Sequence, residues 1–257
     1  MATVLLRRPV TACRADVLGL PPQRVRAARA QRRVRAGAVV GVSPHVVPRP
    51  RDWPERAVLT GWWWDAPPAA GPPPLDPTLE AFLAAGPPPV LVGLGSMPVR
   101  DPAATTRVLV AAARDVGVRL VLQRGWAGLG ANVEDGPDVH VAGDVPHDAL
   151  LPRVRAVVHH GGAGTTGRGL RHGRPTLVLP VLADQFFWGH RLAALGVGPP
   201  ALPLARLRRD ALARRLRRLV GDPSHGERAR AVAARLATED GAAAAADRVA
   251  AWADRLS

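Results

Sequence analysis

The sequence predicts an α/β fold with a doubly wound parallel sheet, for three reasons. Short strand-like runs that are apolar throughout alternate with helical segments from about residue 78 onward. Strands of this kind are buried on both faces, which is typical of a parallel sheet covered by helices on each side. Glycine-rich or polar loops follow several of these runs, where such sheets carry their ligand-binding junctions.

The elements are expected in a regular order. The stretch "AAGPPP" at residues 84–89 ends a helix, because consecutive prolines cannot continue one. Strands are expected at residues 90–94, 118–123, 139–142, 155–159 and 176–181. Helices are expected at residues 102–116, 165–172, 186–195, 208–220, 226–237 and 241–256. The alternation indicates one Rossmann-like domain over residues 78–257.

The residues before this domain have a different character. The stretch "DAPPAAGPPPLDP" at residues 65–77 is too rich in proline for a helix or a central strand and is expected to be a linker. Residues 1–64 hold one arginine-rich helical stretch and two short strand-like pieces, with too few apolar residues for a core of their own. Exposed apolar surface there, including Trp62 to Trp64, would lower solubility or favour self-association. We expect these tryptophans to pack at the domain junction; an acceptor or membrane contact is the alternative.

Composition narrows the class of protein. Of 257 residues, 47% are hydrophobic, but no run of 18 uncharged apolar residues could form a transmembrane segment. The single cysteine, Cys13, excludes an internal disulfide framework and, with no convincing signal peptide, favours a cytoplasmic location. The net charge is +14, yet all 35 basic residues are arginine and lysine is absent, as in a G+C-biased genome. We therefore expect no nucleic-acid partner, and interpret the arginines of residues 206–218 as a solvated helix surface.

The stretch "HHGGAGTT" at residues 159–166 follows a predicted strand and opens a predicted helix. Its glycines let the backbone turn sharply and let an anion approach the amides. Free N–H groups and the helix dipole at the start of a helix favour a phosphate, and His160 can donate to a phosphate oxygen. The stretch fits a diphosphate; the alternative is an ordinary strand-to-helix turn around a buried histidine.

Two further loops belong to the same predicted sheet edge. "GLGSMP" at residues 93–98 follows one strand, and "VLADQ" at residues 181–185 follows another. Asp184 and Gln185 are an adjacent carboxylate and amide, which together accept from and donate to sugar hydroxyls. The alternative for Asp184 is a helix N-cap.

These stretches together resemble a known family. "VVHHGGAGTTGRGLRHGRPTLVLPVLADQFFWGHRLAALGVGP" is similar to the nucleotide-sugar signature of GT-B glycosyltransferases, in the sterol, macrolide and glycopeptide-antibiotic branch of the UDP-glycosyltransferase family. Upstream, "VLVGLGSMP", "QRGWAGL" and "VAGDVPHDALLPRVRAVV" match the same family in order. The resemblance runs from about residue 14 to the end and implies that residues 78–257 are the C-terminal, donor-binding domain.

The resemblance also implies a role for each matching residue. His160 would contact the donor diphosphate, with His159 behind it, and Asp184 and Gln185 would hydrogen-bond the sugar. Plant relatives carry a glutamate at the position of Arg168, so ribose recognition does not transfer. No metal site and no cofactor is implied. The remaining donor contacts would be phosphate contacts of Ser96, Gly162, Gly164, Thr165 and Thr166, base contacts of Val145 and His147, and a base or ribose wall at Trp126.

An inverting enzyme of this family needs a general base for the acceptor hydroxyl. The family places that histidine in an N-terminal acceptor domain, and residues 1–17 contain no histidine. We therefore expect no catalytic residue in this chain and interpret residues 1–64 as a remnant of the acceptor domain. The chain would be the donor half of a glycosyltransferase, cut short by gene decay, a misplaced start or choice of segment. The alternatives are a donor-binding subunit that works with a separate acceptor-domain chain, and a non-enzymatic nucleotide-sugar binder.

The function implied is transfer of a hexose from a UDP-sugar, or alternatively a TDP-sugar, to a hydroxyl of a small lipophilic acceptor. With the base in another segment, the chain alone is expected to bind nucleotide and to transfer sugar poorly or not at all.

Overall fold

The structure is a computed structural model that describes residues 11–17, 19, 21, 37–65 and 71–254. The arginine-rich helical stretch expected within residues 1–64 lies mostly at 22–36, outside the described residues. Before residue 37 the chain forms a short π-helical segment, η1 (Cys13–Val17).

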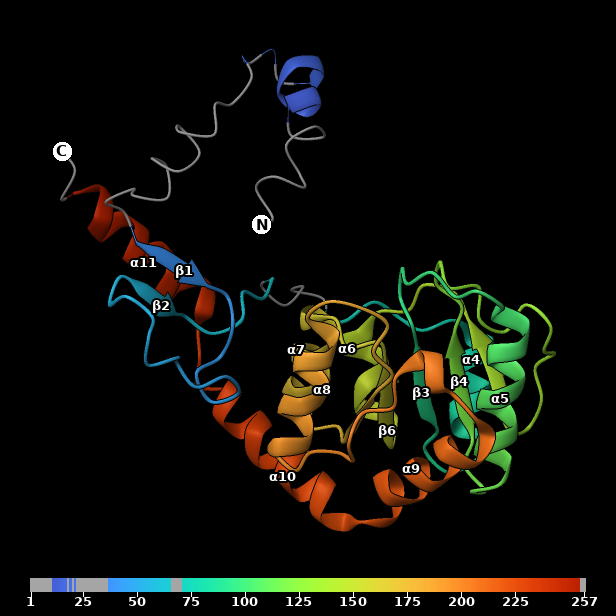
Figure 1. The fold of residues 1–257 in the computed structure, drawn as a ribbon. Coiled ribbons are helices and arrows are strands. Elements are labelled where there is room, and N and C mark those ends of the chain that lie inside the picture. The colour runs from blue at the N-terminus through green and yellow to red at the C-terminus, as the bar shows by residue number, and fades with distance from the viewer. Residues whose placement is uncertain (1–10, 18, 20, 22–36, 66–70, 255–257) are drawn as a thin grey trace.

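Five parallel strands form the central sheet in the order β5-β4-β3-β6-β7 (Figure 1). Chain order and spatial order differ because the chain moves outward from β3 in one direction and then returns to the other side through β6. The doubly wound parallel sheet expected from the sequence is thereby confirmed. The strands are β3 (Val90–Gly93), β4 (Leu120–Gln123), β5 (Val139–Ala142), β6 (Ala156–His159) and β7 (Thr176–Val178).

The two faces of the sheet are covered by different helices. Val90 and Val92 of β3 pack in one buried cluster with α5 (Pro102–Arg114) and α9 (Arg209–Gly221). Leu91 points to the opposite face, in a cluster with α4 (Pro77–Ala84) and the segment formed by α6 (His147–Leu150) and η2 (Leu151–Arg153). Successive strand residues point to opposite faces, and both faces are apolar here, which explains the unbroken apolar runs.

A third cluster lies beside the sheet and includes residues from before the linker. It joins α7 (Ala163–Arg171), α8 (Gln185–Ala194) and α10 (Pro223–Leu236) with Val46 and Trp62. The Trp62 ring centroid lies 6.0 Å from that of Trp64 and 6.1 Å from that of Trp188. Trp62 packs as expected, since only 5% of it is accessible, whereas Trp63, at 51%, is exposed.

The segment before the linker also contacts the end of the chain. Strands β1 (Ala38–Val40) and β2 (Ala57–Leu59) pair in parallel and lie beside α11 (Gly241–Ala253) in Figure 1. The Ser43 hydroxyl donates to Glu239 Oε1 at 2.6 Å, which joins this segment to the turn between α10 and α11. The sequence predicted two short strands in this segment, and both are present. They lie beside a helix from the other end of the sequence (Figure 1) and do not form a core of their own.

Most predicted boundaries differ from the structure by one to three residues. Helix α10 begins at Pro223, earlier than expected, because the Asp222 side chain accepts from the Ser224 N–H and caps it. Pro77, assigned to the linker, is the first residue of α4, where a proline is tolerated. The remaining irregular helix is η3 (Leu204–Arg206).

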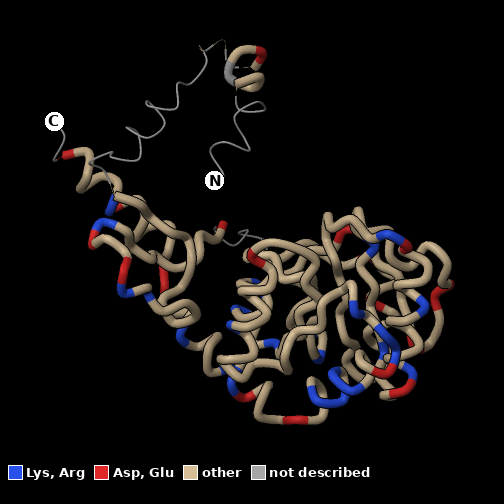
Figure 2. Tube along the Cα trace, viewed as in Figure 1, with Lys and Arg blue, Asp and Glu red and all other residues tan. Residues whose placement is uncertain are grey.

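The basic surface helix expected at residues 208–220 is confirmed as α9. It buries Leu212, Leu216 and Leu219, while Arg209, Arg214, Arg217 and Arg218 are exposed. Figure 2 marks the arginines along this helix in blue.

Gly167 on α7 sets how closely the tryptophans approach this helix. A Cβ atom at position 167 would lie 2.7 Å from Trp62 Cε2 and 2.9 Å from Trp64 Cη2. We expect Gly167→Ala to lower the free energy of unfolding by about 1–3 kcal/mol through overpacking, despite the higher helix propensity of alanine. Urea unfolding measures this. Gly164→Ala on the same helix, where no atom lies within 4 Å, is the control and should leave stability unchanged or slightly raised; equal effects of the two variants would contradict the packing argument.

Candidate functional site

His160 lies where two of the predicted loops meet at the carboxyl edge of the sheet. It directly follows β6 and is half-buried. A Cβ atom at Gly162 would lie 2.6 Å from His160 Nε2, and one at Gly95 would lie 3.1 Å from Cε1. The imidazole therefore fits between the loops because neither position carries a side chain. Burial lowers the pKa of His160, and the Asp184 carboxylate opposes that shift.

The turn after His160 depends on Gly161 and on the buried His159. Gly161 has a φ of 97°, and a Cβ atom there would lie 2.7 Å from Val178 Cγ1 and 2.9 Å from the Gln185 carbonyl oxygen. Its N–H donates to His159 Nδ1 at 2.9 Å. Burial lowers the pKa of His159 to about 3, so its imidazole is neutral at pH 7. His159 thus holds the turn from behind.

Helix α7 begins without a capping side chain. Its N-cap is Gly162, which has no side chain to accept from the amides of the first turn. Those N–H groups have no partner within the helix and lie at the positive end of its dipole. Gly164 is exposed and Thr165 is half-buried, whereas Thr166 is only 1% exposed. An anion has access to the amides and to Thr165, while Thr166 faces the interior in this conformation.

Ser96 and Trp126 lie on neighbouring loops. The loop after β4 is tied to the loop after β3, because the Ala127 N–H donates to the Gly95 carbonyl at 3.2 Å. Ser96 is exposed, and Trp126 is 91% exposed. Both side chains are available at the same edge as His160.

Asp184 is the N-cap residue of α8, but its side chain makes no capping hydrogen bond. Its Oδ2 instead accepts from Trp188 Nε1 at 3.1 Å, and the residue is exposed. The N-cap alternative therefore holds for the position of Asp184 but not for a capping hydrogen bond of its side chain. The preceding residue, Ala183, has a φ of 51°, a costly conformation for a non-glycine residue that is frequent at functional sites.

Gln185 is buried and organises the loop before it. Its Oε1 accepts from the Val181 N–H at 2.7 Å and from the Leu182 N–H at 3.0 Å. Its Nε2 faces the Met97 sulfur at 2.9 Å. The amide thus joins the loops after β3 and β7, and one N–H of Nε2, the one that does not donate to Met97, remains for a ligand.

Val145 and His147 line a cavity of about 520 Å³ next to α7. Burial, followed by the charge of Arg168, lowers the pKa of His147. On the opposite side, the guanidinium carbons of Arg171 and Arg168 lie 5.1 and 5.9 Å from the Trp64 ring centroid. The cavity is lined by Trp64, Asp65, Gly71, Pro72, Pro73, Val145, Pro146, His147, Asp148, Arg168, Arg171 and His172.

The sequence interpretation missed Asp148, Arg171 and His172 as members of this wall. Asp148 accepts from both Arg168 of α7 and His172, the C-cap residue one turn further on. The i, i+4 spacing of the two basic residues was a usable signal for one helix face. Asp148 itself directly follows the predicted base-contact residue His147.

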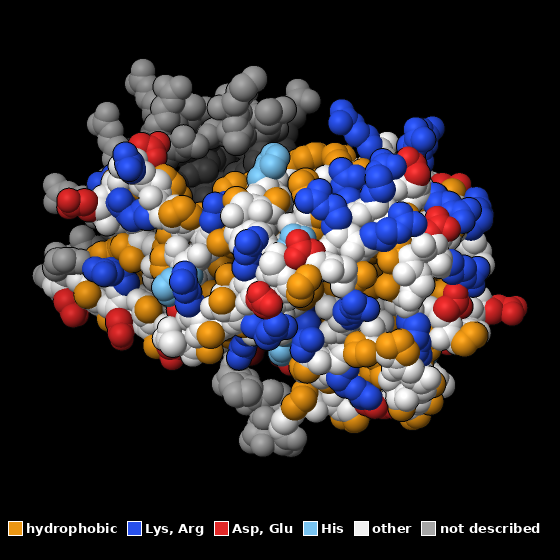
Figure 3. All heavy atoms as spheres, turned by 90° about the horizontal axis from the view of Figure 1, so that it is seen from below, with side chains coloured by type: hydrophobic (Ala, Val, Ile, Leu, Met, Phe, Trp, Pro, Cys, Tyr) orange, Lys and Arg blue, Asp and Glu red, His pale blue; other side chains and the backbone are white. Residues whose placement is uncertain are grey.

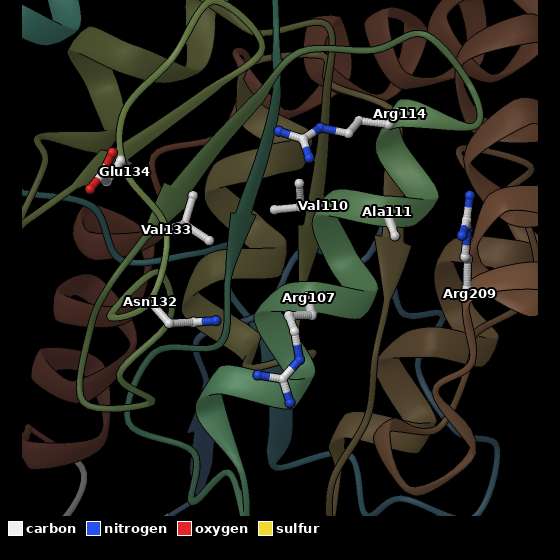
Figure 4. Close-up of a pocket in the computed structure, with 8 residues that line it drawn as sticks. All are labelled: Arg107, Val110, Ala111, Arg114, Asn132, Val133, Glu134 and Arg209. Carbon is white, nitrogen blue, oxygen red and sulfur yellow. The ribbon is translucent and has the colours of Figure 1, made fainter.

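A second cavity, of about 550 Å³, lies against α5 and α9, away from the three loops (Figure 4). Two of its arginines are already paired: Arg114 with Asp138 at 2.6 Å and Arg209 with Asp115. Figure 3 shows arginines spread over one face of the molecule with acidic side chains among them. Paired guanidiniums without a glycine-rich turn do not make a second candidate for the diphosphate.

Two absences apply to the described part of the chain. No group of three or more potential metal-ligating residues is found there. No helix there is long and apolar enough to cross a bilayer.

Comparison with known proteins identifies the family to which the chain belongs. The chain is 40% identical over 209 residues to the sterol 3-beta-glucosyltransferase UGT80B1 of Arabidopsis thaliana, a match that covers 80% of this chain and 33% of that protein. It is 42% identical over 219 residues to the O-mycaminosyltylonolide 6-deoxyallosyltransferase of Streptomyces fradiae, covering 82% and 49%. The crystal structure of the glycosyltransferase VinC in complex with dTDP matches with a TM-score of 0.55 and 28% identity, covering 75% of this chain and 50% of that one.

Fold and comparisons together define the C-terminal half of a GT-B glycosyltransferase. The family model for the C-terminal domain of erythromycin biosynthesis protein CIII-like proteins matches residues 109–252, more than half of the chain. The chain therefore belongs to this EryCIII-like family of transferases. It spans between a third and a half of the length of the two curated relatives described above.

The buried His159 makes stability depend on pH. Its folded pKa of about 3 lies below the unfolded value of about 6.5, so only the unfolded chain takes up this proton between those pH values. This residue should therefore cost about 2 kcal/mol of stability as the pH falls from 6.5 to 5. Urea unfolding of the wild type and His159→Asn should show their stability difference shrinking by that amount. His45→Asn, at a side chain that is 42% exposed, is the control; a pH-independent difference for His159→Asn would contradict the assignment.

Proposed function

We propose that this chain is the donor-binding half of an inverting glycosyltransferase, which moves a hexose from a UDP-sugar, or a TDP-sugar, to a hydroxyl of a lipophilic acceptor. The observation that carries the proposal is the uncapped start of α7, flanked by His160 and continuous along the same helix with the cavity at Val145 and His147. In this proposal residues 78–257 are the donor domain, residues 65–77 the linker and residues 1–64 part of the acceptor domain.

The diphosphate is placed at the start of α7. There the free amides, Thr165 and His160 supply donors, and the helix dipole favours negative charge. Negative charge grows on the leaving diphosphate as the sugar departs, so donors already fixed in position stabilise the transition state more than the ground state. Ser96, exposed on the adjacent loop, adds a hydroxyl donor.

The sugar is placed against the loop after β7. Asp184 Oδ2 already accepts from Trp188, which leaves Oδ1 to accept from a sugar hydroxyl. The Oε1 of Gln185 is occupied by two backbone amides, so its role toward the sugar is that of a donor. One acceptor and one donor side by side fit two neighbouring hydroxyls of a hexose.

The base is placed in the cavity beside Val145 and His147, with Trp126 exposed on the same edge. Neutral His147, whose pKa is lowered by burial, can accept as well as donate. For the nucleotide itself, VinC in complex with dTDP supports a TDP-sugar, and the resemblance to the UDP-glycosyltransferases supports a UDP-sugar.

The acceptor side of the proposal comes from the relatives. Their names specify a sterol and a macrolide-type acceptor, both lipophilic alcohols. The general base that deprotonates the acceptor is assigned to a segment outside this chain, either the rest of a longer polypeptide or a separate acceptor-domain chain. A cytoplasmic location, expected from the single cysteine, is part of the same proposal.

Nucleotide binding tests the donor site directly. Isothermal titration of the purified chain with UDP, TDP and GDP should show binding of UDP or TDP in preference to GDP. His160→Ala should weaken that binding at least about tenfold, since it removes a hydrogen bond to a charged group. His45→Ala, at an exposed position far from α7 in sequence, should leave it unchanged. A folded wild-type chain that binds none of the three nucleotides would refute the proposed donor site.

The same proposal predicts poor catalysis by the chain alone. Nucleotide release from UDP- or TDP-glucose in the presence of a sterol or a macrolide aglycone should stay near background, because no base is supplied to the acceptor hydroxyl. Adding the acceptor domain of a relative should raise the rate. Efficient transfer by the isolated chain would contradict the assignment of the base to another segment.

A further inference from the structure

The cavity beside α7 contains a carboxylate in an unusual setting. Asp148 lines it together with the predicted base-contact residues Val145 and His147. Its side chain is 45% exposed, so part of the carboxylate faces the open space and is available to a ligand. The other acidic residue of the lining, Asp65, belongs to the segment before the linker and has no such surroundings.

Two hydrogen-bond donors, one on α7 and one at its C-cap, fix the Asp148 carboxylate. His172 Nε2 donates to Oδ1 at 2.8 Å, and Arg168 Nη1 donates to Oδ2 at 3.2 Å. Each oxygen of a carboxylate has about two acceptor positions, so each keeps one for a further donor. The hydrogen bond from His172, with the charge of Arg168, also lowers the pKa of Asp148, which keeps it ionised at neutral pH.

A vicinal diol is the ligand group that matches this arrangement. Two neighbouring hydroxyls can donate to the two oxygens of one carboxylate at the same time. In a nucleoside diphosphate such a diol is present only on the ribose, at the 2′ and 3′ positions.

We propose that Asp148 accepts hydrogen bonds from the ribose 2′- and 3′-hydroxyls of the donor nucleotide, and so selects ribonucleotides over 2′-deoxyribonucleotides. The inference rests on the proposed function, since it needs the nucleotide to lie between the cavity and the start of α7. It names a specificity residue that the sequence resemblance did not assign.

Asp148, on α6, contacts α7 at a point that suits this role. Its partner Arg168 lies five residues after Ala163, the first residue of the helix, which is about 7.5 Å along the axis. A diphosphate at the helix start and a ribose near Arg168 are therefore neighbours along the same helix. Val145 and His147, next to Asp148 in the chain, then lie beside the base.

Arg168 explains why the carboxylate comes from another element. A guanidinium has no acceptor for a hydroxyl, so Arg168 cannot itself accept from a ribose. Here Arg168 contacts the Trp64 ring on one side and Asp148 on the other. The acceptor is instead the Asp148 carboxylate at the start of α6, and Arg168 positions this carboxylate.

The consequence is a preference for a UDP-sugar over a TDP-sugar, because the thymidine nucleotide lacks the 2′-hydroxyl. Loss of one hydrogen bond to a half-exposed charged group should weaken binding about tenfold. The unpaired oxygen remains partly solvated, so a much larger factor is not expected.

The test is titration of the folded chain with UDP and with 2′-deoxy-UDP, which differ only at the proposed contact. The wild type should bind UDP about tenfold more tightly. Asp148→Asn keeps the size of the side chain, and it should bring the two affinities within about twofold by weakening UDP alone. Asp144→Asn removes the same charge from an exposed residue of the same loop that does not line the cavity, and should keep the preference.

The ratio of the two affinities separates recognition from structural support. If Asp148 only held α6 against α7, its replacement would weaken both nucleotides equally and the ratio would stay unchanged, which would overturn the inference. That result, with His160→Ala still weakening both nucleotides, would leave the proposed donor site standing. No binding of either nucleotide to the folded wild type would overturn both. Asp148→Glu, which restores a carboxylate, should recover part of the preference for UDP.

Discussion

The turn at residues 159–162 is the constraint on which the candidate site depends. Gly161 must adopt a φ of 97° with two neighbours closer than any side chain allows, and the fully buried His159 accepts its N–H. This turn points the start of α7 toward the sheet edge and leaves its first amides without a capping side chain. The His160 ring, the Arg168–Asp148 pair and the packing of Gly167 on Trp62 all follow from where α7 begins.

Much of the fold was predictable from the sequence, because a sheet covered on both faces leaves unbroken apolar runs such as residues 156–158. The loops at His160 and Asp184 were predictable for a related reason, since they follow those strands directly. The partners of Trp62 were not, because Trp188 and Gly167 are more than a hundred residues away from it in the chain. The inward orientation of Thr166 and the carboxylate of Asp148 likewise depend on contacts between elements, which no local pattern encodes.

Residues 38–64, before the linker, complete the packing of helices that follow it, although their composition does not indicate this role. Val46 and Trp62 complete the cluster of α7, α8 and α10, and Trp64 forms one wall of the cavity under Arg168 and Arg171. The far side of this segment contacts the chain end, where a Cβ atom at Gly241 would lie 2.4 Å from the Trp62 carbonyl oxygen. Residues 38–64 thus support the helices around the candidate site.

The two adjacent histidines show how the site can hold an anion without a fixed positive charge beside it. Burial keeps His159 neutral, and its Nδ1 accepts from the Gly161 N–H. His160 is half-buried; burial lowers its pKa, and the Asp184 carboxylate opposes that shift. A permanent cation at this position would favour any anion, including free phosphate. A neutral imidazole beside backbone amides instead contributes directed hydrogen bonds, whose strength depends on the position of the phosphate oxygens. Selectivity then comes from the geometry of the turn and from the cavity further along α7, where Asp148 is already paired with Arg168 and His172.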